Sequence, residues 1–197
     1  MPSLTNVYLP SAFEFTDDVT VRGSTHFGPP SRIGIGALIM TLPSPYEWDC
    51  RLFRMGSNEL TSLEIGKDAC RFESVTEFDL SKYPKLKSLW IGRTGFEYVN
   101  ELSIIGLSEL ERVVIGDNCF TQHMEEYGGN PNRHFYLKNC PKLKSLKMGR
   151  YSFSDYTVIE IENMDSLEVI EIGDVNEWGY SFYYASLELK SILIHKA

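Results

Sequence analysis

The stretch Leu60-Thr61-Ser62-Leu63-Glu64-Ile65-Gly66 recurs along the chain and indicates how the chain folds. Its copies follow the pattern L-x-x-L-x-L, with other aliphatic residues allowed, and all but the last end in glycine. They lie at residues 60–66, 86–92, 110–116, 143–149, 167–173 and 189–194. The five glycines follow one another at intervals of 26, 24, 33 and 24 residues. A nearly constant period is typical of repeat proteins, in which one unit stacks on the next.

A second phrase alternates with the first and holds two apolar residues two positions apart. Its copies are Phe78 and Leu80, Leu102 and Ile104, Phe135 and Leu137, and Ile159 and Ile161. Alternation with period two over a short run is typical of half-buried β-strands, so each unit holds two short strands. An aromatic residue follows three of the glycines by four positions, at Phe96, Phe120 and Phe153, and Cys70 takes this place in the first copy.

We predict a single, mostly β repeat solenoid over residues 1–197, with consecutive copies side by side in a parallel sheet. Residues 1–23 carry both phrases, whereas residues 24–57 are irregular and hold a degenerate copy between Ile33 and Met55. This gives about eight turns of roughly 25 residues each. The glycine after the strand allows a tight corner that a side chain would crowd. We expect one buried file, meaning a row of side chains that stack on one another across adjacent strands. Its members are Leu63, Leu89, Val113, Leu146 and Ile170.

The signs of the charged residues support this register. Stacked copies place equivalent positions next to each other, where like charges repel. Both the position after the first leucine and the position after the glycine alternate in sign. The first column is Lys87, Glu111, Lys144, Glu168 and Lys190, and the second is Arg93, Asp117, Arg150 and Asp174. Exposed pairs of this kind stabilise only weakly, so the pattern is informative about register.

The phrases resemble leucine-rich repeats, and the two-strand unit with its aromatic residue is most similar to the BspA-like leucine-rich repeat group. The resemblance is clearest over residues 58–194. It departs from the usual pattern at the asparagine that commonly bridges the turns, because only Asn118 occupies that place. The resemblance implies recognition of partners, mostly proteins, often at cell surfaces or in host–microbe contact. It does not imply catalysis.

Composition excludes several classes of protein. The chain has 197 residues and a formal net charge of −8, which argues against nucleic-acid binding through bulk charge. The apolar run at 37–40 is too short to insert into a membrane, and the N-terminus does not look like a signal peptide. We expect a soluble protein, in the cytoplasm or at a surface as part of a longer chain. Without an obvious polar cap at its ends, the array could also be a fragment or associate end to end.

The four cysteines show no C-x-x-C spacing, so we expect neither a zinc site nor a cofactor. Most of them read as small buried hydrophobes, with one disulfide left open as an alternative.

Outward positions of the first phrase form the candidate binding surface. One column holds Tyr8, Glu64, Trp90, Val114, Lys147, Glu171 and Leu193, and its neighbour holds Ser62, Ser88, Arg112, Ser145, Val169 and Ser191. Trp, Tyr and Arg are enriched at binding hot spots. We predict partner binding at Tyr8, Trp90, Arg112, Val114, Lys147 and Glu171. The alternative is that Trp90 merely covers the sheet.

Three further segments have functional alternatives. The longest unit contains an insertion at 121–133, interpreted as a surface loop, in which His123, Glu125, Glu126 and the neighbouring His134 form a weak metal-site candidate. The irregular segment 24–57, with Tyr46, Trp48 and Phe53, is interpreted as packing. The segment 178–184 is dense in aromatic residues. We interpret these residues as packing in a corner of the coil, and the alternative is an aromatic surface that binds a glycan.

The carboxylates would matter in a polysaccharide-cleaving solenoid. They are Glu160, Glu162, Glu168, Glu171 and Asp174. However, no catalytic or nucleotide-binding motif accompanies them. We therefore predict a non-enzymatic binding module with a protein partner. The alternatives are a carbohydrate-binding or polysaccharide-cleaving β-solenoid, or a structural spacer within a larger protein.

Overall fold

The computed structural model describes residues 7–9, 31–33, 39–42, 50, 58–122, 129–173 and 180–190. These residues form two β-sheets and one short 3-10 helix, η3, at Leu80–Lys82. The first sheet consists, in spatial order, of β1 (Val7–Leu9), β2 (Ser31–Ile33), β3 (Ile39–Leu42), β4 (Ser62–Ile65), β6 (Ser88–Ile91), β8 (Arg112–Ile115), β10 (Ser145–Met148) and β12 (Val169–Ile172). The second consists of β5 (Glu77–Asp79), β7 (Glu101–Ile105), β9 (Asn130–Lys138), β11 (Tyr156–Glu162) and β13 (Ser186–Lys190).

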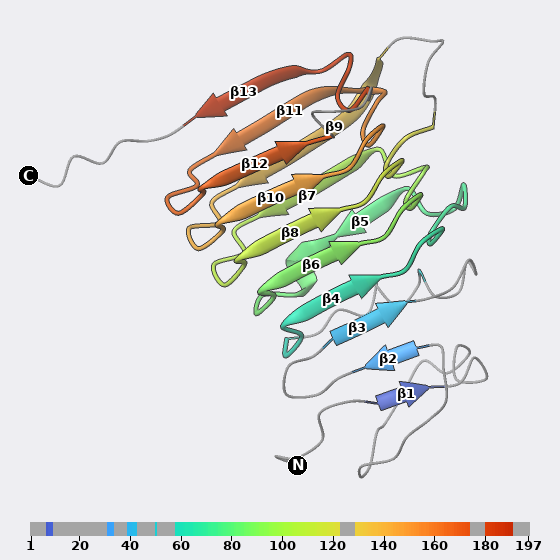
Figure 1. Cartoon of the computed structure of the whole chain (residues 1–197), viewed down its shortest axis with the longest axis vertical. Coiled ribbons are helices and arrows are strands. Elements are labelled where there is room, and N and C mark those ends of the chain that lie inside the picture. The colour runs from blue at the N-terminus through green and yellow to red at the C-terminus, as the bar shows by residue number, and fades with distance from the viewer. Residues whose placement is uncertain are drawn as a thin grey trace, which may run out of the picture.

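From β4 onward the chain alternates between the two sheets and therefore winds as a coil (Figure 1). Neighbouring strands pair in parallel within each sheet, from β3 to β12 in the first and from β5 to β13 in the second. The strands of the two sheets run in opposite directions. The described residues hold four complete windings, from β4 to β12. The predicted parallel β-solenoid is confirmed, whereas its leucine-rich repeat type and its eight turns stay predictions.

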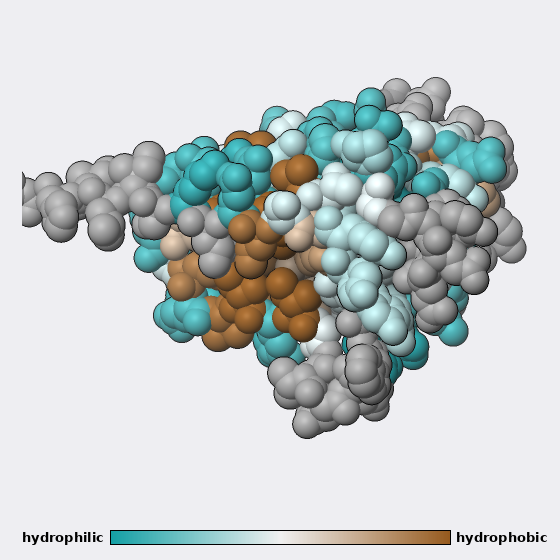
Figure 2. Space-filling model, turned by 90° about the horizontal axis from the view of Figure 1, so that it is seen from above, coloured by the Kyte–Doolittle hydropathy of each residue, from teal (hydrophilic) through white to brown (hydrophobic). Residues whose placement is uncertain are grey.

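The predicted buried file exists, and its members lie directly opposite one another on adjacent strands. They are Leu63, Leu89, Val113, Leu146 and Ile170. The first four are at most 1% exposed, but Ile170 on β12 is 40% exposed because no described strand stacks beyond it. Figure 2 looks onto this end of the stack, where a brown apolar area is visible. Burial of each aliphatic side chain contributes about 1.5–3 kcal/mol, which is the main stabilisation of the coil.

A stack of phenylalanine rings runs along the coil, with Phe78 contributed by β5 and the other four rings by the corners that follow first-sheet strands. The rings belong to Phe78, Phe96, Phe120, Phe153 and Phe182, with successive centroids 4.5, 5.2, 4.7 and 4.8 Å apart. At this position in each winding the backbone is left-handed, with φ from 52° to 58° at Cys70, Phe96, Phe120, Phe153 and Phe182. Such a conformation is uncommon for a bulky residue. The stack and the backbone bonds between windings, such as Phe120 N to Gly95 O at 2.8 Å, hold it in place.

Backbone hydrogen bonds also connect successive windings at the position where leucine-rich repeats commonly carry asparagine. Asp68, Thr94 and Asn118 are all left-handed there, and each donates its N–H to the carbonyl of the next winding. A side-chain asparagine contact occurs instead at the opposite corner, where Asn163 Nδ2 donates to Asn139 Oδ1 at 2.9 Å. The corner geometry therefore does not depend on one residue type.

Crowding between windings explains the repeated glycine, as predicted. A Cβ atom on Gly92 would lie 2.7 Å from Lys67 N, and one on Gly116 would lie 2.8 Å from Arg93 N. Real Cβ contacts are not this short, so consecutive windings approach each other closely only because no side chain intervenes.

The charge column after the glycine is confirmed for Arg93, Asp117 and Arg150, and its fourth member, Asp174, lies outside the described residues. Asp117 lies 3.6 Å from Arg93 on one side and 3.6 Å from Arg150 on the other. In the column after the first leucine, backbone bonds join Glu111 to Lys87 and Lys144 to Glu111, so the alternating signs do lie side by side. The predicted last member, Lys190, is wrong, because it lies on β13 of the other sheet, opposite Glu162.

This error follows from the prediction of a first-phrase copy at 189–194. For the residues of this copy that the structure describes, that prediction is also wrong. Leu187 and Leu189 continue the second phrase, because they lie opposite Ile159 and Ile161 on β11. Residues 191–197 lie outside the described residues.

The N-terminal strands also differ from the prediction. β1 pairs with β2, and β2 with β3, in antiparallel fashion, so Val7–Leu9 and Ser31–Ile33 do not repeat the parallel stacking of the later copies. β3 is the first strand in parallel register, with Met40 opposite Leu63. Tyr46, Trp48 and Phe53 lie outside the described residues.

The insertion at 121–133 is not a simple surface loop. Its ends are fixed, because Thr121 is 7% exposed and residues from Asn130 onward belong to β9. Arg133 is fully buried. Residues 123–128 lie outside the described residues.

Candidate functional site

The outer face of the first sheet brings the predicted binding residues together. Trp90 on β6 lies directly opposite Val114 on β8, which lies opposite Lys147 on β10, which lies opposite Glu171 on β12. Arg112 lies two residues before Val114 on the same strand and therefore points to the same face. Four predicted residues thus form one row across four strands, and Arg112 stands beside it.

Tyr8 does not belong to this group. It lies on β1, and β2, β3 and β4 separate that strand from β6. At a strand spacing of about 4.8 Å, this places the Tyr8 backbone on the order of 19 Å from Trp90. Leu193 and Ser191, which the sequence placed in the same columns, lie outside the described residues.

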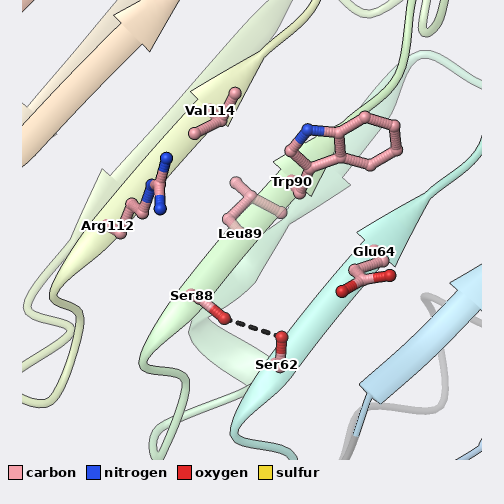
Figure 3. Close-up of a pocket in the computed structure, with 7 residues that line it drawn as sticks. All are labelled: Ser62, Glu64, Ser88, Leu89, Trp90, Arg112 and Val114. Carbon is pink, nitrogen blue, oxygen red and sulfur yellow. Dashed lines mark hydrogen bonds between the residues drawn. The ribbon is translucent and has the colours of Figure 1, made fainter.

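Trp90 is the centre of a shallow groove of about 350 Å³ (Figure 3). The groove is lined by Ser62, Glu64, Ser88, Leu89, Trp90, Arg112 and Val114. The Trp90 side chain lies on the outer face and is 45% exposed, so it does not pack under a neighbouring side chain. Glu64 lies on one side of it, on β4, and Arg112 and Val114 lie on the other, on β8.

The polar groups of the groove differ in whether they have hydrogen-bond or ion-pair partners. The hydroxyls of Ser62 and Ser88 hydrogen-bond each other at 2.6 Å (Figure 3). Among the described residues, the side chains of Glu64 and Arg112 have no partner. A carboxylate and a guanidinium that pair with no other described residue therefore flank the indole ring. Glu64, Ser62 and Ser88 stand in the predicted columns but were not among the predicted binding residues.

Lys147 and Glu171 are less available. Lys147 Nζ donates to Glu171 Oε2 at 2.5 Å, so the two charges largely satisfy each other at the edge of the group. Both side chains are substantially exposed, at 41% and 52%, and an ion pair of this kind contributes little to stability.

The second sheet carries another depression, of about 470 Å³, near β5 and β7. It is acidic: Glu77 lies directly opposite Glu101, and Asp79 lies beside them. Ser81 donates two hydrogen bonds to Asp79, and these hydrogen bonds lower the pKa of that carboxyl. The outward positions of the second phrase would have indicated this surface.

Three of the five carboxylates considered for catalysis, Glu160, Glu162 and Glu171, pair with lysine side chains. Lys138 pairs with both Glu160 and Glu162. The hydrogen bond from Lys138 lowers the pKa of Glu160, so this carboxyl is not poised to donate a proton near neutral pH. Asp174 lies outside the described residues.

No cluster of metal-ligating side chains occurs within the described part of the chain. His134 Nε2 lies 2.8 Å from the Pro131 carbonyl oxygen. His123, Glu125 and Glu126 of the metal-site candidate lie outside the described residues.

The cysteines divide into two kinds. Cys50 and Cys70 form a disulfide, which resolves the alternative left open by the sequence. Cys119 and Cys140 are free and buried, as predicted. Burial raises the pKa of the Cys119 thiol to about 12 and also raises that of Cys140, so neither thiol is activated as a nucleophile.

The aromatic segment at 178–184 packs only in part. Phe182 joins the phenylalanine stack, as expected for corner packing, but Tyr183 is 62% exposed and Tyr184 is 39% exposed. Trp178 lies outside the described residues.

No helix in the described ranges has the length and apolar character needed to cross a membrane. Comparison of the chain with protein-family models, with curated proteins and with solved structures gives no match. The groove around Trp90 is therefore the feature on which a functional assignment rests.

Proposed function

We propose that this protein is a non-enzymatic binding module, a solenoid of the leucine-rich repeat type, whose first sheet recognises a protein partner. The observation that carries the proposal is the exposed indole of Trp90 beside the guanidinium of Arg112, which pairs with no side chain among the described residues. Tryptophan and arginine dominate the energetics of protein interfaces, because each combines a large contact area with specific polar contacts.

The surroundings of Trp90 support the same function. Val114 offers apolar surface next to the ring, and Glu64 offers a carboxylate on its other side. A partner that covers the groove would remove these groups from water together, which strengthens each polar contact. The Lys147–Glu171 pair would then lie at the rim, where charges affect the association rate more than the affinity.

Affinity measurements with variants of the groove test this proposal. The immobilised protein is used to capture proteins from an extract of its source organism, and each captured protein is purified and titrated by calorimetry. Trp90→Ala should weaken binding by about 30-fold, as expected for a hot-spot residue, and Arg112→Ala should also weaken it. Tyr136→Ala, on the outer face of the second sheet, is the matched control and should bind like the wild type. Wild-type affinity of Trp90→Ala would refute the site.

Carbohydrate binding is the second candidate, because an exposed indole face flanked by a carboxylate and a guanidinium also suits a sugar ring. The Ser62 and Ser88 hydroxyls favour it less, since they already bond each other. A glycan array probed with the wild type and with Trp90→Ala separates the two candidates. Binding of one glycan class that is lost in Trp90→Ala would favour the second candidate, and release of reducing ends from a polysaccharide would indicate cleavage. A protein with neither activity would fit the spacer alternative.

A further inference from the structure

Among the described residues, the end of the solenoid formed by β12 and β13 is an open surface. These two strands are the last of their sheets, and no described strand pairs with their outer edges. An unpaired edge presents a row of backbone N–H and C=O groups that can pair with another strand. Within the described strands, both sheets therefore have an unpaired edge at the same end of the coil.

The same end exposes apolar side chains that would be core in any other winding. Ile170 and Ile172 continue the buried files of the first sheet but are 40% and 37% exposed. Leu187 continues the file of Ile159 on the second sheet and is 54% exposed. Figure 2 shows a continuous brown area over this end. A contiguous apolar patch on a folded protein marks a surface that associates.

The order of charges on β13 makes this edge complementary to itself. Glu188 and Lys190 lie on the outer face on either side of position 189, where they pair with each other at 2.5 Å, and their side chains remain 52% and 58% exposed. When two β13 strands pair in antiparallel fashion about position 189, residue 188 of one strand lies opposite residue 190 of the other, on the same face. Each glutamate then faces a lysine, twice in the interface.

We propose that this protein forms a two-fold symmetric dimer through this end, in which β13 pairs antiparallel with β13 of a second copy. A two-fold interface uses the same patch on both copies, so the apolar residues around Leu187 and Ile170 are buried against the same patch. The Trp90 groove lies on the outer face of the first sheet, away from the paired edge. The dimer therefore presents two grooves, and a partner with repeated sites gains avidity.

The mass in solution over a concentration series tests this dimer, by light scattering coupled to size-exclusion chromatography. The wild type should reach twice the chain mass of 22.5 kDa. Leu187→Glu should be monomeric, because it places a charge in the apolar interface. Glu188→Lys should weaken dimerisation roughly ten-fold, because lysine then faces Lys190 of the second copy. The exchange Glu188→Lys/Lys190→Glu restores opposite charges and should restore the dimer. Circular dichroism confirms that each variant is folded.

The matched control is Glu77→Lys, which alters an exposed glutamate on β5, the terminal strand at the other end of the same sheet. It should leave the dimer unchanged. Loss of association in Glu77→Lys would indicate head-to-tail stacking and overturn the proposal. A wild type that stays monomeric at all concentrations, that grows beyond a dimer, or whose charge exchange does not restore association would overturn it as well. These outcomes are independent of Trp90, so they do not bear on the proposed function.

Discussion

Arg133 donates a hydrogen bond to Asp155 across 2.6 Å, and neither side chain has appreciable contact with solvent. The guanidinium also donates to the Glu97 and Val99 carbonyls and lies 4.8 Å from the Tyr156 ring. It thereby joins the winding that contains β9 to the windings on both sides. In the longest winding the pair adds polar contacts to the phenylalanine stack, in which Phe120 lies between Phe96 and Phe153.

Removal of one member of this pair should destabilise the protein strongly. Arg133→Met leaves the Asp155 carboxylate buried without its cation, which costs about 3–5 kcal/mol. The double variant Arg133→Met/Asp155→Leu should recover most of this loss, because no uncompensated charge remains. Urea denaturation measures the free energy of unfolding. The control is Lys142→Met, which removes an exposed pair with Glu109 and should cost less than about 1 kcal/mol. Equal losses for Arg133→Met and Lys142→Met would contradict the account.

The loss of stability caused by truncating a core side chain to alanine should depend on its position along the buried file. Leu146→Ala removes a fully buried side chain and should cost about 2–5 kcal/mol. Ile170→Ala changes the next member of the same file, but its side chain is 40% exposed, so the loss should be less than half as large. Both are measured by denaturation at a protein concentration that keeps the chain monomeric. If Ile170→Ala proved as costly as Leu146→Ala, something other than the described strands would cover this end.

Glycines with different surroundings should respond differently to alanine. Gly116→Ala forces a Cβ against the backbone of the preceding winding and should cost roughly 3 kcal/mol, as overpacking does. Gly106 has a φ of 72° and open space around its Cβ position, so Gly106→Ala should cost only the left-handed penalty of about 1 kcal/mol. Thermal unfolding gives the order of the two. The reverse order would rule out close contact between windings as the reason for the repeated glycine.

Thiol labelling should distinguish the two kinds of cysteine. At pH 8 the folded protein should show no reactive thiol, because burial holds the pKa of Cys119 near 12 and raises that of Cys140. Unfolding in guanidinium without reductant should expose these two thiols alone, and reduction should release Cys50 and Cys70 in addition. Four thiols in the unreduced chain would disprove the disulfide.

The same thiol gives a direction for the pH dependence of stability. The pKa of Cys119 is raised in the folded state above its ordinary value of 9.0. The unfolded chain therefore loses this proton first as the pH rises, and stability falls between about pH 9 and pH 12. In Cys119→Ala the slope over this interval should be smaller than in the wild type, as measured by urea denaturation at several pH values.

The repeat allowed most of the core to be predicted, because the period fixes which residues become neighbours. Val113 and Leu146 could be assigned to one file although 33 residues separate them, since spacing from the glycine does not depend on the length of the insertion. Trp90, Val114 and Lys147 could be placed in one row for the same reason. The sequence could not establish that Lys147 and Glu171 in that row pair with each other while Arg112 beside it has no described partner, because this depends on side-chain rotamers.

Two errors have a common physical origin. A short run such as Leu187-Glu188-Leu189 fits both phrases, since each has apolar residues two positions apart. Only the pairing with Ile159 and Ile161 assigns it to the second sheet. Arg133 was placed in a surface loop because it follows glycine, asparagine and proline and carries a charge. Its burial depends on Asp155, 22 residues away, which no local pattern reveals.

The alternating charge columns imply that the electrostatic repeat of this protein is twice as long as its packing repeat. Asp117 serves Arg93 on one side and Arg150 on the other. Deletion of the single winding at 94–117 would keep every aliphatic file intact but would set Arg93 beside Arg150. Deletion of two adjacent windings would preserve both the packing and the sign order. Duplication or deletion is therefore least disruptive when it involves two adjacent windings at once. A chain that changes length in this way should gain or lose an even number of windings.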